Sequence, residues 1–261
     1  MHTPSIIFYR MLFSVAMLAV LILIRRESFR ISAKQLKAIF FLSIFYAATS
    51  LLLVESYLYI PSGLATTISF LYPIAVTLIL FFGFGQRVSA STLIAILLSF
   101  AGVFLLSFNS ASGNLDGRGL LCVIITIFTY SAYIVGMNKS CVNSLGSLVL
   151  SFYVLLFTTL FFSINMSLQG GLESIPGFME LGSLLLLGFI PTVLSNIFLF
   201  LALKRIDSAT TSLFGCMEPL TALLVGYFVF SEEMLWQQVL GAAIIIAAVL
   251  MVVLQTFKGK S

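Results

Sequence analysis

The fold is decided by two stretches that align without a gap: residues 60–84, IPSGLATTISFLYPIAVTLILFFGF, and residues 206–230, IDSATTSLFGCMEPLTALLVGYFVF. Each carries a proline inside an apolar run, Pro73 in the first and Pro219 in the second, and these are 146 positions apart. The same offset aligns further identical residues: Phe84 with Phe230, Ala101 with Ala247, and Val103 with Val249. Shared prolines and shared segment lengths indicate an internal repeat.

The composition around these stretches excludes a soluble globule. Of 261 residues, 61% are apolar and 8% are charged, and the mean hydropathy is +1.17. Soluble domains are roughly half apolar and a quarter charged. A bilayer-spanning helix needs about 20 apolar residues. Nine stretches meet this requirement, so we predict an all-α integral membrane protein with helices near residues 4–24, 36–56, 62–83, 89–108, 117–138, 144–167, 178–202, 207–230 and 235–256.

The distribution of basic residues predicts the orientation, because Lys and Arg in short loops stay on the cytoplasmic side. Eleven fall after the first, third, fifth and seventh stretches or in the C-terminal tail, whereas one, Arg118, falls in the alternate connections. We therefore expect an external N-terminus and a cytoplasmic C-terminus in an inner (plasma) membrane. An odd number of spans separates the third stretch from the eighth, so the repeat is inverted, as in many secondary transporters.

The repeat divides the chain into two predicted domains, residues 1–110 with four helices and residues 111–261 with five. The offset pairs the first four helices with the sixth to the ninth. The partner of the fifth helix would precede Met1, so the arrangement is an incomplete five-plus-five pair of inverted repeats, here four plus five.

This layout and several short motifs resemble the drug/metabolite transporter superfamily, specifically the EamA-type transporters. The matching residues are Arg10, Pro73 with Phe84-Gly85-Gln86-Arg87-Val88, Glu218-Pro219-Leu220, Phe230-Ser231-Glu232, Gln238 and Gly241. Gln86 stands where the family usually has Glu. The resemblance implies ten helices with both ends cytoplasmic, and this chain starts at the second. We expect that its start was assigned too late; a trimmed chain and a naturally short member are the alternatives. The resemblance also places 89–108 and 235–256 at the periphery and gives Glu232 a capping or gating role.

Glu218 is the sharpest candidate site residue. It lies at the middle of the predicted 207–230 helix, where an acid costs about 2.5–3.5 kcal/mol and normally faces a cavity or a partner. Gly215 shares its helical face. The equivalent face of the other repeat carries Ser69 and Tyr72, and we expect the two faces to line a substrate pathway. Helix packing, with Glu218 as a structural ion-pair partner, is the alternative interpretation.

Four further residues complete the predicted substrate site. Arg10 suits a substrate carboxylate or an acidic partner such as Glu55, although it also fits snorkelling to the membrane surface. Tyr130 belongs to an aromatic face of the 117–138 helix that suits an amphipathic ligand, or core packing. Ser195 and Asn196 align with Thr49 and Ser50 at the repeat offset, which fits a central site; interhelical hydrogen bonds are the alternative.

These features favour a secondary transporter, an exporter of small amphipathic metabolites such as amino acids, working by alternating access. Glu218 is the candidate proton carrier; uncoupled diffusion fits equally well. No ATP-binding motif is present, and we predict no cofactor, metal site, catalytic residues or nucleic-acid partner. The expected partners are a small-molecule substrate, the lipid bilayer and, as hypotheses, protons and a second copy bound through 89–108 and 235–256. The competing interpretations are a non-transporting membrane subunit, an enzyme acting on lipid-linked intermediates and, least favoured, a channel.

Overall fold

A computed structural model describes residues 3–86, 88–106, 116–168, 171–230 and 235–258. Every regular element in these ranges is a helix, which confirms the predicted all-α class. The elements are α1 (Thr3–Arg25), α2 (Ala33–Ser56), α3 (Ser62–Ser69), α4 (Tyr72–Phe84), α5 (Ala90–Leu106), α6 (Gly117–Lys139), the 3-10 turn η2 (Cys141–Ser144), α7 (Ser147–Leu168), α8 (Phe178–Gly188), the π-helical turn η3 (Phe189–Leu194), α9 (Ser195–Arg205), α10 (Ser208–Phe214), α11 (Met217–Phe230) and α12 (Trp236–Lys258).

All nine predicted stretches are helical, but three of them are interrupted. Seven helical segments in the described part of the chain are long and apolar enough to cross a membrane, and Ala90–Leu106 is a shorter apolar helix. The stretch 62–83 is split into α3 and α4, 207–230 into α10 and α11, and 178–202 contains the turn η3 between α8 and α9. The predicted residues Arg87 and Glu232 lie outside the described ranges.

Local sequence explains where the short helices begin and end. Asp207 caps α10, because its carboxylate accepts hydrogen bonds from the backbone N–H (2.9 Å) and the hydroxyl (2.7 Å) of Thr210. Pro61 precedes α3, where its missing N–H costs nothing. Gly85 ends α4 with φ at +60°, a left-handed conformation that glycine adopts without steric penalty. The Ser62 and Ser208 starts are 146 positions apart, as are the Phe84 and Phe230 ends.

The chain forms two compact units, and these differ from the two repeats predicted from the sequence, residues 1–110 and 111–261. Unit 1 is Met1–Ala47 with Gly136–Arg205, and unit 2 is Ala48–Val135 with Ile206–Ser261. Helices α2 and α6 each contribute to both. At the repeat offset, α1 pairs with α7 in unit 1, while α5 pairs with α12 in unit 2. Each unit therefore collects equivalent helices from the two halves of the chain.

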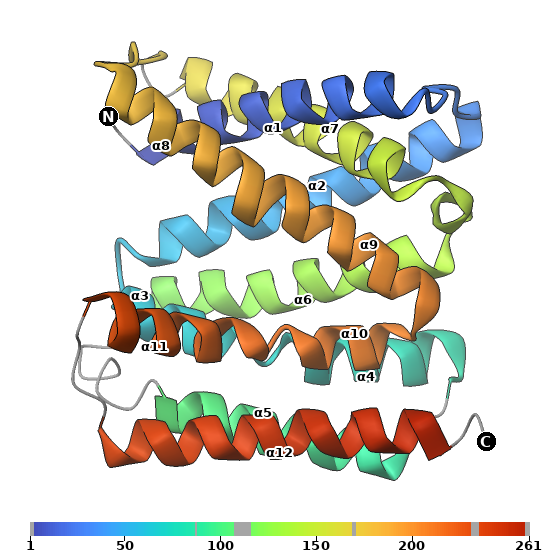
Figure 1. Ribbon diagram of the computed structural model, residues 1–261, viewed down its shortest axis with the longest axis vertical. Coiled ribbons are helices and arrows are strands. Elements are labelled where there is room, and N and C mark those ends of the chain that lie inside the picture. The colour runs from blue at the N-terminus through green and yellow to red at the C-terminus, as the bar shows by residue number, and fades with distance from the viewer. Residues whose placement is uncertain (1–2, 87, 107–115, 169–170, 231–234, 259–261) are drawn as a thin grey trace. The chain divides into compact units, whose positions relative to one another are not determined.

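In unit 1, α1 packs against both α7 and α8 (Figure 1). The Ser14 hydroxyl on α1 donates to the Gly188 carbonyl of α8 at 2.9 Å and to the Arg10 carbonyl at 2.6 Å. A Cβ atom at Gly188 would lie 3.2 Å from the Arg10 carbonyl oxygen, so the glycine permits this close approach. In the N-terminal half of α7, the Tyr153 hydroxyl donates to the carbonyl of Phe29, which follows α1, at 2.8 Å.

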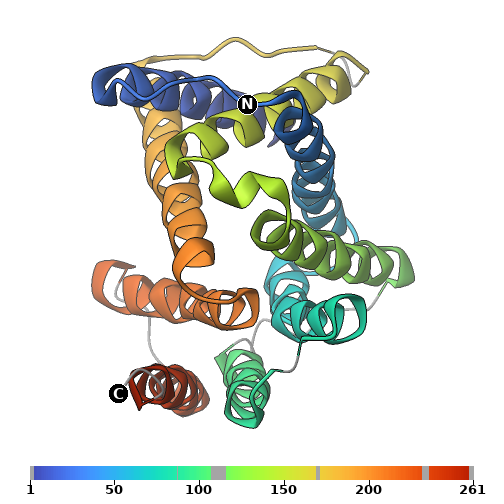
Figure 2. The same ribbon diagram turned by 90° about the vertical axis from the view of Figure 1, so that its right-hand side faces the viewer.

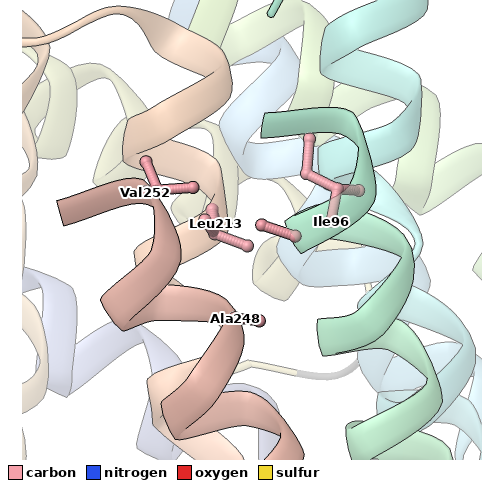
Figure 3. Close-up of a cluster of buried hydrophobic side chains, with 5 residues drawn as sticks. Ile96, Leu213, Ala248 and Val252 are labelled. Atoms are coloured by element: carbon pink, nitrogen blue, oxygen red, sulfur yellow. The ribbon is translucent and has the colours of Figure 1, made fainter. Parts of the chain in front are cut away.

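In unit 2, α5 and α12 lie side by side along much of their length (Figures 1 and 2). Their backbones approach so closely that a Cβ at Gly102 would lie 2.8 Å from the Gly241 carbonyl oxygen, and one at Gly241 would lie 2.6 Å from that of Gly102. Small residues at such crossings are typical of membrane helices. Beside them, Leu213 of α10 packs into a buried cluster with Ala95, Ile96, Ala248 and Val252 (Figure 3).

Candidate functional site

The two interrupted helices of unit 2 break at equivalent points. Helix α3 ends at Ser69 and α4 starts at Tyr72, while α10 ends at Phe214 and α11 starts at Met217. Adding 146 to the first pair of positions gives 215 and 218, so the breaks coincide within a residue. Discontinuous helices near the middle of the membrane commonly build the binding sites of secondary transporters, because they free backbone groups there.

At both breaks the backbone forms hydrogen bonds between an N–H and the carbonyl three residues earlier, as in a 3-10 helix. Cys216 N–H donates to the Leu213 carbonyl and Glu218 N–H donates to the Gly215 carbonyl, both at 3.0 Å. Pro219 has no N–H, so it cannot be the partner that the Gly215 carbonyl would have in a continuous helix. At the first break, Leu71 N–H likewise donates to the Ile68 carbonyl at 3.0 Å, two residues before Pro73.

Tyr72 connects the two breaks. Its hydroxyl donates to the Ser212 carbonyl, in the last turn of α10, at 2.9 Å. Helix α6 holds the tyrosine from the other side: the Ser131 hydroxyl donates to the Tyr72 carbonyl at 3.0 Å, and the Tyr130 ring packs edge-on with centroids 4.9 Å apart. Tyr72 is buried.

Glu218 lies beside this group, but in a different setting from the one the sequence indicates. It is in the first turn of α11, not at the middle of a continuous helix. A helix N-terminus stabilises a negative charge, because its backbone N–H groups point towards it. The Glu218 side chain is exposed, and its backbone N–H donates to the carbonyl of Gly215, the glycine that lies against the Tyr72 hydroxyl.

Of the predicted residues, the structure brings together Tyr72, Tyr130, Gly215 and Glu218 in unit 2. A Cβ at Gly215 would lie 1.7 Å from the Tyr72 hydroxyl oxygen, so the glycine makes room for the phenol. Ser69, also in unit 2, is half-buried, and its hydroxyl donates to the Thr66 carbonyl of its own helix at 2.7 Å.

The other three predicted residues belong to unit 1. Arg10 on α1 is half-buried, and its Nε atom is buried without a hydrogen-bond partner among the described residues. Asn196 is buried, and its side-chain amide donates to the Thr192 carbonyl at 2.8 Å. Ser195 is exposed.

Sequence reasoning missed two of the partners in this group. Ser131 is one of many hydroxyls in apolar helices, and nothing in the pattern distinguishes it. Ser212 contributes its backbone carbonyl, which has no signature in a sequence. The polar residues that the repeat offset aligns fall in different units. The Thr49 hydroxyl is 2.8 Å from that of Thr129 in unit 2. Asn196, which the offset aligns with Ser50, lies in unit 1.

The chain matches a family model in two blocks, residues 1–108 and 117–254, which together span nearly its full length. The model describes the EamA-like transporter family. The chain belongs to this family. The resemblance to EamA-type transporters inferred from the sequence motifs is thereby confirmed. Each block of the EamA-like match contains one of the two broken helices of unit 2.

Curated relatives carry the same general description. An uncharacterized transporter of Archaeoglobus fulgidus is 24% identical over 227 residues, covering 86% of this chain and 80% of the relative. A second uncharacterized transporter of the same organism is 27% identical over 172 residues, covering 64% of this chain and 58% of the relative.

A solved crystal structure shares the fold. It superposes with a TM-score of 0.83, covering 100% of this chain and 91% of the solved one, at 16% sequence identity. At that identity the likeness concerns the fold alone. The EamA-like family assignment identifies a multi-pass membrane transporter of a small molecule in a lipid environment, and it indicates a transporter and not an enzyme.

Proposed function

We propose that this EamA-like protein is a secondary transporter that exports small amphipathic metabolites, such as amino acids, by alternating access. The observation that carries the proposal is the pair of helix breaks at equivalent positions of the repeat, with Tyr72, Tyr130 and Glu218 gathered beside them in unit 2. In inverted-repeat transporters such breaks provide the polar groups that a substrate needs within the membrane.

The proposed substrate-binding groups differ in chemistry between the two units. In unit 2, the exposed carboxylate of Glu218 suits an ammonium group, while the Tyr130 ring and the half-buried Ser69 suit an amphipathic body. In unit 1, the guanidinium of Arg10 suits a carboxylate. Tyr72, Gly215, Ser195 and Asn196 are the remaining members of the proposed set.

Glu218 is also the proposed proton carrier. A cationic substrate and a proton would compete for Glu218, because each of them neutralises the same single carboxylate. The positive-inside distribution of Lys and Arg supports an inner-membrane protein with its N-terminus outside and its C-terminus in the cytoplasm.

The test is counterflow in liposomes that contain the purified chain, with a panel of labelled amino acids. The variants are Glu218→Gln and, as the matched control, Glu180→Gln, which removes an exposed acid from the first turn of α8. We expect saturable exchange in the unmodified protein and in Glu180→Gln, and loss of exchange in Glu218→Gln.

The pH dependence of the same assay tests proton coupling. We expect a transmembrane pH gradient to drive uptake in the unmodified protein. If Glu218→Gln transports at the normal rate with the normal pH profile, Glu218 neither binds the substrate nor carries the proton. Absence of exchange for all amino acids extends the panel to other amphipathic metabolites, and failure there contradicts the transporter proposal in favour of a subunit.

A further inference from the structure

The break between α10 and α11 changes which donors reach the Ser212 carbonyl. In a continuous helix this carbonyl would accept a hydrogen bond from Cys216 N–H, but that group donates to Leu213. The Gly215 N–H reaches Ser212 in a three-residue bond of 3.1 Å, and the Tyr72 hydroxyl supplies the second donor at 2.9 Å. A phenol from another helix thus takes the place of a lost backbone donor.

Both partners of this hydrogen bond are packed. On the Tyr72 side, the Ser131 hydroxyl donates to the Tyr72 backbone carbonyl and the Tyr130 ring packs against the Tyr72 ring. On the α10 side, Leu213, next to Ser212, is buried in the cluster with residues of α5 and α12 (Figure 3). Helices α4 and α10 also pack against each other along this region (Figure 1).

The absence of a side chain at Gly215 leaves room for the Tyr72 phenol. A methyl group there would lie 1.7 Å from the Tyr72 hydroxyl oxygen and 3.0 Å from its Cζ atom. The first distance is a severe overlap, and the second is at the lower limit of real Cβ contacts. The hydroxyl is therefore the main obstacle to a side chain at this position, and the ring carbon and the Ser212 carbonyl oxygen, 3.1 Å away, are smaller ones.

We propose that Tyr72 is a positioning residue that ties the two broken helices together and thereby orients Glu218. The tie links the start of α4 to the last turn of α10, so the two breaks move together. Glu218 follows the second break by two residues, and the backbone that carries it is set by this tie. This role replaces the substrate contact that the sequence predicts for Tyr72, because the phenol acts indirectly through the Ser212 carbonyl. The transport role of the tie rests on the proposed function, whereas the tie itself does not.

The first test reads the break without any transport. Cys216 lies at the break and is buried, so its reaction with N-ethylmaleimide reports opening of the tie. The background is Cys122→Ser with Cys141→Ser, which leaves one thiol. We expect Tyr72→Phe to raise the labelling rate of Cys216 about threefold, the factor that corresponds to one average interhelical hydrogen bond in a membrane. The matched control is Tyr227→Phe, which removes an exposed hydroxyl from α11 and leaves the rate unchanged.

The second test is a double-mutant cycle. We expect Gly215→Ala to raise Cys216 labelling more than Tyr72→Phe does, and the double variant to label more slowly than the sum of the two single effects predicts, because removing the hydroxyl removes most of the overlap. Additive effects, or no effect of Tyr72→Phe, would overturn the tie.

Transport kinetics then test the role of the tie in transport. We expect Tyr72→Phe to lower the maximal rate of counterflow about threefold, because the two breaks are no longer held together. An unchanged maximal rate, with Cys216 labelling raised as expected, would overturn the transport role of the tie. If labelling responds as expected but no variant transports, the tie stands and the proposed function fails.

Discussion

Prolines interrupt spans in both units, but the two units repair the interruption differently. In unit 1, Pro191 cannot donate to the Leu187 carbonyl, and the hydroxyl of the next residue, Thr192, donates to it instead at 3.1 Å. The repair stays within the π-helical turn of one span. In unit 2, the break beside Pro219 is completed by Tyr72 from another helix. An internal repair keeps a span intact by itself, whereas an external repair makes one span depend on another.

The largest expected difference between the units is in the loss of stability when a glycine is replaced by alanine, Gly215 in unit 2 or Gly188 in unit 1. Gly215→Ala places a methyl group 1.7 Å from the Tyr72 hydroxyl oxygen. We expect it to destabilise the protein by about 3 kcal/mol, the upper end of overpacking effects, and to abolish counterflow. The midpoint of thermal unfolding in detergent measures the first effect. Ser69→Ala, at the equivalent position of the other repeat, is the control and has a small effect because Ser69 bonds its own helix.

Gly188→Ala is the corresponding change in unit 1. Its methyl group would lie 3.2 Å from the Arg10 carbonyl oxygen and from the Ser14 hydroxyl, so small shifts accommodate it. We expect a loss of about 1–2 kcal/mol in the same unfolding measurement. A loss larger than that of Gly215→Ala would show that the α1–α8 approach is the tighter of the two.

Ser131→Ala tests the support behind Tyr72. The Ser131 hydroxyl is buried and bonds the carbonyls of Tyr72 and Ile127, at 3.0 and 2.7 Å. We expect a loss of about 1 kcal/mol in stability and faster maleimide labelling of Cys216, the same direction as the effect expected for Tyr72→Phe. Unchanged labelling would mean that Tyr130 packing alone fixes the phenol.

Thr192→Val is expected to have the smallest effect. It keeps the shape of a buried side chain and removes the donor to the Leu187 carbonyl, at a cost of about 0.6 kcal/mol. Because the repair in unit 1 is internal, counterflow should be unchanged within error. A strong loss of transport in this variant would contradict the difference drawn between the two units.

The sequence predicts the helices well, because apolar runs of membrane length leave few alternatives. The repeat offset, read from Pro73 and Pro219, also anticipates that the two helices are alike, and their breaks are indeed equivalent. The breaks themselves are not predicted, since Glu218 is assigned to the middle of one helix and lies instead in the first turn of another. A proline in an apolar run marks a weakness in a helix, but tertiary packing decides whether it bends, widens or breaks.

The candidate site is predicted less completely than the fold. Side-chain type and spacing select Tyr72, Tyr130, Gly215 and Glu218, which the structure gathers in unit 2. The same reasoning cannot find the Ser212 carbonyl, because backbone acceptors are present at every residue. The same reasoning also cannot assign helices to compact units. Arg10 and Asn196 both belong to unit 1 because of how their helices pack, and their positions along the sequence do not predict that packing.

The close contact of α5 with α12 has a consequence for biosynthesis. Helix α5 leaves the ribosome long before its partner, since α5 ends at Leu106 and α12 begins at Trp236. Until then Gly102 lacks the Gly241 backbone that packs against it in the folded protein. Unit 2 can be completed only when the last helix has been inserted, so a nascent chain that stops before α12 leaves this face of α5 uncovered.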